Sequence, residues 1–285
     1  MPGKRSAKAT RRTLVAERAW VNGRFEPETA VTIEQGRISQ VGPARDLPAD
    51  TPTERLPRRL LLPGTLNAHN HSFQSLLRGI ADDCDFFTWR DRALYGYTPR
   101  MTEEVIYQGA RFAFAEMLRA GVTTVCDFFY IHSDGNDNDR AVIRAARDLG
   151  MRLVLARTMY DWEGAPPQYQ ESIENAVRRT RDLWRECHDG EMTHVCPAPH
   201  SPHAASPEMI QAGSALAAEL GTRFHIHVAE GRYERETIQT RWGLSPIRWL
   251  ESLGLELDRA TIIHGVWLDD DDIDLMAERD MRLVY

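Results

Sequence analysis

The chain has 285 residues, 42% of them hydrophobic, which is enough for one large α/β domain with a buried core. Its 35 basic and 42 acidic side chains give a net charge of −7, with no basic stripe beyond the N-terminus, so nucleic acid is not an expected partner. Apolar runs fall short of the ~20 residues that a membrane helix needs, and the basic start lacks an apolar signal core, so we expect a cytoplasmic protein without a membrane partner.

The first part of the chain predicts a tail and a small β unit. Residues 1–12 are basic and polar, and we expect them to be disordered. Residues 13–58 contain short strand-like runs separated by the turn dipeptides Asn22-Gly23 and Gln35-Gly36. This pattern favours a small β-sandwich-like unit, with strands expected at Thr13 to Trp20, Ala30 to Glu34 and Arg37 to Val41.

From residue 59 to residue 285 the pattern changes to alternating strands and helices. Helix starts are marked at Thr102, Ser206 and Ser245, and glycines follow the expected helix ends. Strands that alternate with helices predict a parallel sheet, either a barrel or a doubly wound sheet. The expected strands are Leu60 to Ala68, Val122 to Phe129, Arg152 to Arg157, Thr193 to Ala198, Arg223 to Val228, Thr261 to Val266 and Met281 to Tyr285.

Histidines stand at the ends of several of these strands. His69 and His71 form an HxH pair, and alternate residues of a strand share a face, so both can bind one metal ion. A second strand ends in His227, and a third in His264. An isolated HxH is more often packed than metal-bound, but histidines at the same end of several strands converge at the mouth of a barrel. We therefore predict a (β/α)8 TIM-type barrel with a metal site; His225 is expected on the opposite face and structural.

The lysines and cysteines limit the chemistry. Lys4 and Lys8 are the only lysines, so Schiff-base, pyridoxal phosphate and P-loop chemistry lack their essential residue. Four scattered cysteines without CxxC spacing indicate neither a disulfide framework nor a thiolate zinc site. The GxSxG elbow, a strand-linked GxGxxG and the HxE…PCxxC deaminase signature are also missing.

These motifs resemble the amidohydrolase superfamily of metal-dependent hydrolases and deaminases, over nearly the whole chain. The resemblance implies that His69, His71 and His227 hold one divalent metal ion, expected to be Zn²⁺. It also implies that Glu230 and His264 are catalytic and that His200 contacts substrate. The family's two-metal branch needs a lysine on the fourth strand, so the one-metal deaminase branch fits better.

The resemblance also implies one missing element. Only seven barrel strands can be counted up to Tyr285, so we expect an incomplete barrel whose last strand, with its aspartate ligand, would follow residue 285. The acidic run from Asp269 to Asp272 is not a substitute, because it reads as the first turn of a helix, where the helix dipole favours acidic residues.

Within that branch, the loops look most like N-formimino-L-glutamate deiminases. Gln74, Arg90 and Tyr130 would then hold substrate, with Arg90 pairing a carboxylate. On sequence alone, a surface arginine and a core tyrosine are equally good interpretations of Arg90 and Tyr130. His203 stands where that group has a substrate-binding arginine, so we expect it to contact substrate as well, although the change from arginine to histidine weakens the likeness to that group. The strings that carry the likeness are HNHSFQSLLRGIADD (His69 to Asp83), FFTWRD (Phe86 to Asp91), FFYIHSD (Phe128 to Asp134) and APHSPHAASPE (Ala198 to Glu208).

Three functions remain open. The first is a formimidoylglutamate-type deiminase, which releases ammonia from an amidine-like C–N bond of a small-molecule substrate. The second is a deaminase of a heterocycle such as a purine nucleoside, a pterin or a triazine, which would use the same metal and acid–base residues. The third is a catalytically inactive fragment or pseudoenzyme. A homo-oligomer is a possible assembly, and the sequence does not specify it.

Overall fold

The computed structural model describes residues 11–285, which form two compact units divided after Gly64. Most of the expected N-terminal tail lies outside the described residues, and Arg12 already begins the first strand. Within residues 11–285, no helix combines the length and the apolar character needed to cross a lipid bilayer.

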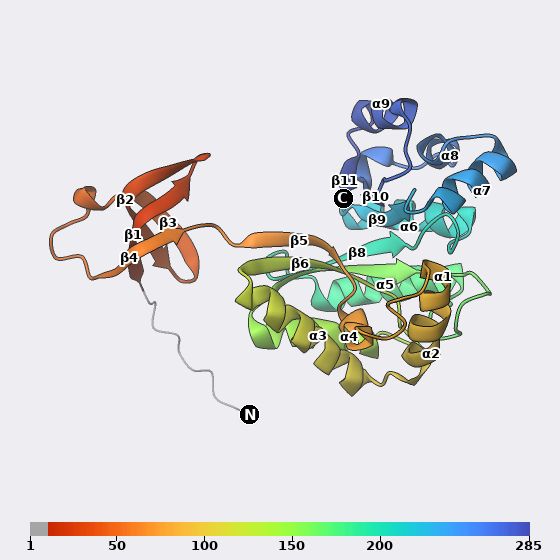
Figure 1. Ribbon diagram of the computed structural model, residues 1–285, viewed down its shortest axis with the longest axis horizontal. Helices are drawn as coiled ribbons and strands as arrows, with labels where there is room; N and C mark the ends of the chain where they lie inside the picture. Colours follow the sequence, from red (N-terminus) through yellow and green to blue (C-terminus); the bar gives the residue numbers. More distant parts are fainter. Residues whose placement is uncertain (1–10) are drawn as a thin grey trace. The chain divides into compact units, whose positions relative to one another are not determined.

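The described part of the first unit is a single four-stranded sheet with the order β3-β2-β1-β4 (Figure 1). Both predicted turn dipeptides connect antiparallel strands, and their four residues all have positive φ angles, as type I′ hairpin turns require. The strands are β1 (Arg12–Val21), β2 (Arg24–Glu34), β3 (Arg37–Pro43) and β4 (Thr53–Leu61), and η1 (Ala44–Asp46) is a short 3-10 turn.

Two expectations for this region are wrong. A sandwich needs two facing apolar layers, but the buried apolar side chains of this sheet are few and small: Val15, Ala16, Ala19, Ala30 and Val31. The first barrel strand was expected to begin at Leu60, which instead belongs to β4, parallel to β1.

The second unit contains seven parallel strands, each at a place that the sequence predicts; the predicted and observed bounds of β6 are the same, and those of the other six differ by one or more residues. One sheet has the order β5-β6-β7-β8 and the other the order β9-β10-β11, so spatial order follows chain order. The backbone N–H of His227 donates to the carbonyl oxygen of His200 over 3.0 Å, which joins β9 to the segment after β8. The strands are β5 (Thr65–Asn70), β6 (Val122–Phe129), β7 (Arg152–Met159), β8 (Thr193–Pro199), β9 (Phe224–Val228), β10 (Ala260–His264) and β11 (Arg282–Val284).

Helices connect these strands, as the alternating pattern predicts, and helices α3, α4 and α5 pack against β6, β7 and β8 (Figure 1). The longer helices are α3 (Glu103–Arg119), α4 (Asp137–Leu149), α5 (Ile173–Cys187), α6 (Pro207–Leu220), α7 (Arg232–Trp242), α8 (Pro246–Ser252) and α9 (Asp270–Glu278). Short helical turns are η2 (Ser72–Leu77), α1 (Phe86–Trp89), η3 (Arg90–Leu94), α2 (Tyr95–Tyr97), η4 (Thr98–Arg100) and η5 (Leu257–Arg259).

Local capping chemistry fixes the helix starts at the predicted residues. The Thr102 side chain accepts the Val105 N–H at the start of α3, and the Ser206 side chain accepts the Met209 N–H at the start of α6. Asp269 caps α9 in the same way, by accepting the Asp272 N–H over 3.0 Å. The acidic run is therefore a helix start, as predicted.

The histidines of interest lie at or directly after the carboxyl ends of β5, β8, β9 and β10.

Candidate metal centre and active site

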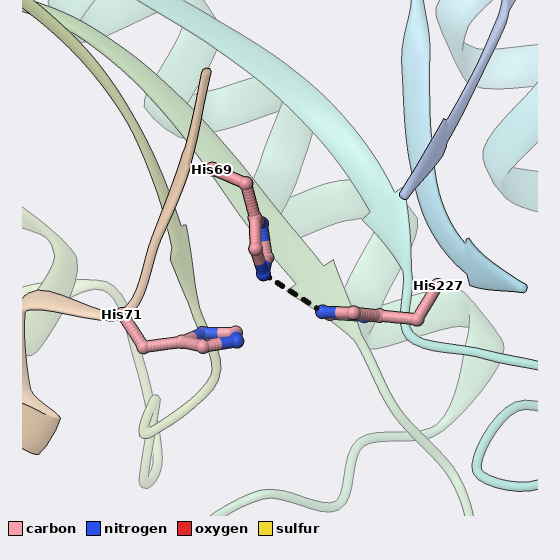
Figure 2. A group of neighbouring side chains, drawn as sticks. All are labelled: His69, His71 and His227. Carbon is pink, nitrogen blue, oxygen red and sulfur yellow. Dashed lines mark hydrogen bonds between the residues drawn. The ribbon is translucent and has the colours of Figure 1, made fainter. Parts of the chain in front are cut away.

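Three imidazoles from two strands converge on one point (Figure 2). His69 lies on β5, His71 directly follows β5, and His227 lies on β9. Their candidate ligand nitrogens all lie within 4.8 Å of one another. The two strands are separated by three others, so the fold itself brings the HxH pair to the third histidine.

The second ring nitrogens of two of these histidines are held by backbone carbonyls. His71 Nδ1 lies 2.6 Å from the carbonyl oxygen of Phe128, and His227 Nδ1 lies 3.0 Å from that of His200. A carbonyl oxygen only accepts hydrogen bonds, so each Nδ1 carries the proton and each Nε2 keeps a free lone pair. This is the usual outer support of a metal-ligating histidine.

The protonation state also suits a metal. Burial, followed by repulsion from neighbouring imidazoles, lowers the pKa of His69 to about 2, and burial lowers the pKa of His71 to about 4. Burial and the surrounding histidines also hold the pKa of His227 well below its usual value. The three rings are therefore neutral near pH 7, which is the form that binds metal.

These residues fit a zinc ion. Nε2 of His69 and Nε2 of His227 lie 3.3 Å apart. Two nitrogens ~2.05 Å from one tetrahedral ion are separated by ~3.3 Å, so the spacing is that of two zinc ligands. Three neutral imidazoles are also the donor set of a catalytic zinc site, which leaves further coordination positions for water, substrate or another ligand.

A buried carboxylate that the sequence analysis missed holds the HxH segment in place. Asp127 on β6 is fully buried and accepts hydrogen bonds from the Ser72 N–H (2.7 Å), the Ser72 hydroxyl (2.7 Å) and the Asn70 side-chain amide (3.0 Å). Burial raises the pKa of Asp127 to about 6. Both neighbours of His71 are thus bound to one carboxylate, which fixes the direction of that ring. The only sequence signal was an acidic residue near the end of an apolar strand.

The predicted acid–base residues lie beside the metal ligands. Glu230 follows β9, and its Oε1 lies 3.7 Å from Nε2 of His264, the last residue of β10. Burial raises the pKa of Glu230, and the nearby His264 and His203 oppose that shift. His264 and Ala229, the residue before Glu230, both have positive φ angles, so the chain turns sharply at the end of each strand, and the turn at Ala229 directs the Glu230 side chain.

His200 and His203 follow β8 and line the same cavity. The His200 ring lies 4.9 Å from the His227 ring, and its Nδ1 is 2.9 Å from the Ser201 hydroxyl. Burial and the other histidines hold the pKa of His200 well below its usual value. His203 Nδ1 lies 2.9 Å from a buried carboxylate oxygen of Glu234.

His225 does not lie where we expected it. Residues two apart on a strand share a face, so His225 points to the same side of β9 as His227. Its Nδ1 lies 3.7 Å from Cys126 Sγ on β6. The ring is partly buried, and burial lowers its pKa to about 4.

One cavity of about 740 Å³ contains all ten predicted site residues. Gln74 donates to the Tyr130 hydroxyl over 2.7 Å, so these two predicted residues support each other. The Arg90 guanidinium lies 5.2 Å from the Phe87 ring and 5.1 Å from the Tyr95 ring, with 22% of its side chain exposed. Arg90 is therefore a cavity residue and not a free surface arginine.

The sequence analysis missed the aromatic wall of this cavity. We use this name for the rings of Phe86, Phe87, Tyr95, Tyr160, Trp162 and Tyr169, which line the cavity together with Tyr130. The hydroxyls of Tyr95 and Tyr160 lie 3.3 Å apart, and the Tyr130 and Tyr169 rings lie 5.1 Å apart. Clustered aromatic residues in the loop after β5 were the available signal, but their convergence with the loop after β7 depends on the tertiary fold.

Comparisons with known proteins agree with this geometry. A model described as the amidohydrolase family matches residues 60–284. A 5-methylthioadenosine/S-adenosylhomocysteine deaminase from Syntrophobacter fumaroxidans is 34% identical over 92% of this chain and 58% of its own length. A 5′-deoxyadenosine deaminase from Methanothermobacter thermautotrophicus is 31% identical over 90% of this chain and 58% of its own length. The chain thus spans little more than half the length of these curated relatives.

Two solved structures share the fold. An adenosine deaminase from Xanthomonas campestris with bound zinc has a TM-score of 0.83 and 25% identity, covering 96% of this chain and 62% of that chain. A zinc complex of atrazine chlorohydrolase from Arthrobacter aurescens TC1 has a TM-score of 0.85 and 24% identity, covering 95% of this chain and 64% of that chain.

Proposed function

The chain belongs to the amidohydrolase family, and we propose that it carries the metal-binding and acid–base residues of a zinc-dependent deaminase that acts on an adenosine-type nucleoside. The observation that carries the proposal is the convergence of three neutral imidazoles, Glu230 and His264 at one cavity. The reaction replaces the exocyclic amine of a ring N=C–N carbon by oxygen from water and releases ammonia.

His69, His71 and His227 would hold the zinc ion, which would supply Lewis acidity and bring the pKa of a water molecule in the site toward ~7. Glu230 accepts the proton of the attacking water and returns it to the departing ammonia. Its raised pKa suits this exchange, because the group must take and release a proton near neutral pH. In this proposal His264, 3.7 Å from Glu230, orients that carboxylate and stabilises developing negative charge, and His200 hydrogen-bonds the substrate ring.

The aromatic wall favours a flat heterocycle as substrate. Its six rings and the Tyr130 ring line a cavity whose volume lies in the range that holds a drug-sized ligand. Aromatic faces stack on purine rings, whereas they offer little to a small flexible acid. The names of the curated relatives also refer to adenosine derivatives. Our first expectation, a formimidoylglutamate-type deiminase, is therefore less well supported than its heterocycle alternative.

Arg90 supports a second candidate. Its guanidinium is placed in the cavity wall, where it can pair a substrate carboxylate. Formimidoylglutamate carries such a group, but so does S-adenosylhomocysteine. A carboxylate contact at Arg90 is thus compatible with either substrate, and the two must be separated by assay.

The test is a substrate panel on the zinc-loaded protein. Ammonia release is measured with 5′-methylthioadenosine, S-adenosylhomocysteine, 5′-deoxyadenosine, adenosine and N-formimidoyl-L-glutamate. We expect turnover of at least one nucleoside, with the matching change in the adenine absorbance band. Glu230→Gln, at equal zinc content, is the matched control for activity from a contaminant.

Two results would overturn the proposal. Turnover of N-formimidoyl-L-glutamate without turnover of any nucleoside would restore the first expectation. Full zinc occupancy without turnover of any of the five compounds would favour the pseudoenzyme alternative.

A further inference from the structure

Glu234, which the mechanism does not use, is a buried carboxylate beside the catalytic residues. It lies on the first turn of α7 and is 1% exposed. Burying a carboxylate is costly unless its oxygens are hydrogen-bonded. Both oxygens of Glu234 have partners: Oε2 accepts from His203 Nδ1 over 2.9 Å, and Oε1 accepts a hydrogen bond from the backbone N–H of Ala229.

The bond to Ala229 acts on the turn that carries Glu230. Ala229 has a φ angle of 54°, which a residue with a Cβ rarely adopts. Its carbonyl oxygen accepts the N–H groups of Val266 and Trp267, each over 3.0 Å. The peptide groups on both sides of Ala229 are therefore fixed, one by Glu234 and the other by the segment after β10. Because Glu230 is the next residue, these bonds determine where its carboxylate points.

The bond to His203 acts on the wall of the cavity. The carboxylate only accepts hydrogen bonds, so His203 Nδ1 carries a proton and Nε2 is left for a ligand. His203 lines the cavity, and 31% of its side chain is exposed. The ring lies between His200 (5.9 Å) and Tyr233 (5.8 Å), which limits its rotation.

We infer that Glu234 is a positioning residue that couples a substrate contact at His203 to the placement of Glu230. One carboxylate holds the cavity-facing imidazole with one oxygen and the Glu230 turn with the other. The inference rests on the proposed deaminase function for its kinetic part. Its structural part, the bond from His203 to Glu234, does not depend on turnover.

Replacing Glu234 with glutamine leaves one acceptor for two donors. The amide oxygen can bind either the Ala229 N–H or the His203 Nδ1–H, so one of the two elements shifts. A misplacement of ~1 Å in a catalytic group lowers turnover up to ~100-fold, so we expect kcat to fall about 10- to 100-fold in Glu234→Gln. His203→Ala should mainly raise KM, because it removes a substrate contact and keeps the Ala229 bond.

The experiment measures kcat and KM of Glu234→Gln, His203→Ala and the double variant on the best nucleoside of the panel. The two changes should be non-additive, because they affect one network. The matched control is Glu236→Gln on the same helix, whose exposed side chain pairs with Arg232 over 2.8 Å, and its kinetics should not change. Zinc content and thermal unfolding are measured on every variant, and His203→Ala serves as the test if Glu234→Gln fails to fold.

A second readout is independent of activity. In proton–nitrogen NMR of the histidine side chains, the wild type should show a hydrogen-bonded Nδ1–H resonance that disappears in His203→Ala and changes in Glu234→Gln. If no nucleoside is turned over, the proposed function fails, and this resonance still tests the bond. Absence of the resonance in the wild type would overturn the inference. Unchanged kcat and KM in a folded Glu234→Gln would also overturn it.

Discussion

Replacing His225 with glutamine should make the metal-free protein less sensitive to acid. Burial, followed by repulsion from Arg223, lowers the pKa of His225 from 6.5 to about 4. As the pH falls below 6.5, the unfolded chain binds a proton at this ring before the folded chain does. Stability from His225 is therefore present above pH ~6.5 and is lost as the pH falls toward ~4.

The expected size follows from the pKa difference. At about pH 5 the unfolded ring is mostly protonated, whereas the folded ring is still mostly neutral. This pH lies ~1.5 units below the pKa of 6.5 in the unfolded chain. At 1.36 kcal/mol per unit, the free energy of unfolding falls by ~2 kcal/mol. The ring is only partly buried, so ~2 kcal/mol is an upper value. His225→Gln should remove this loss between about pH 7.5 and about pH 5.

Urea unfolding of both metal-free proteins at these two pH values is the assay. The quantity compared is the change in unfolding free energy between the two pH values, so any constant cost of the substitution cancels. A variant whose unfolding free energy falls by the same amount as that of the wild type would show that His225 is not held neutral in the fold.

Four further substitutions test the site. Glu230→Gln should keep its zinc and lose ~10²- to 10⁴-fold in turnover, and near-normal turnover would remove Glu230 from the mechanism. His69→Ala should lose both zinc and turnover, and full zinc occupancy by metal analysis would show that the HxH pair is structural. Asp127→Asn should abolish a stability loss of ~2 kcal/mol between about pH 4 and about pH 6, because the raised pKa of about 6 makes the ionised folded form unfavourable as the pH rises; an unchanged pH dependence in urea unfolding would contradict this. For S-adenosylhomocysteine, which has a carboxylate, Arg90→Ala should lower kcat/KM by a factor that corresponds to ~1.5 to 3 kcal/mol of lost transition-state stabilisation. For 5′-methylthioadenosine the loss should be much smaller. Equal losses for the two substrates would show that Arg90 does not bind the carboxylate.

The parts of the fold that were predictable have local causes. Buried parallel strands read as apolar runs, and β6 (Val122–Phe129) was predicted with its exact bounds. Helix α3 begins after Thr102 because a threonine hydroxyl satisfies a free N–H there. The turn at Asn22-Gly23 needs two positive φ angles, which this dipeptide tolerates.

Strand β4 could not be predicted in this way. Its side chains are mostly exposed and four of the nine are charged, and Thr53–Leu61 shows no alternation of apolar and polar residues. Its parallel pairing with β1 joins Thr13 to Thr53 and Ala16 to Leu56. A pairing over that sequence distance depends on the tertiary fold and leaves no local signal.

The same distinction between local and tertiary causes applies to the residues of the site. His69, His71 and His227 were predictable because a strand places alternate residues on one face and strand ends meet at one mouth. Glu234 was not predictable, because Glu234 and Glu236 look alike in the sequence of α7. The structure buries the first and exposes the second. Whether a carboxylate is buried depends on the partners that the fold supplies.

For the proposed deaminase, the origin of each residue in the fold limits how substrate specificity can change. The three imidazoles are placed by strands β5 and β9, and backbone carbonyls hold two of them, whereas Arg90 and the aromatic wall come from the segments after β5 and β7. Substitutions in those segments can reshape the cavity without moving a metal ligand. The exception is the network of Glu234, which reaches both His203 in the wall and the turn of Glu230. Most cavity substitutions should therefore change substrate affinity alone. A substitution at His203 that also disturbs Glu234 should change both substrate affinity and turnover.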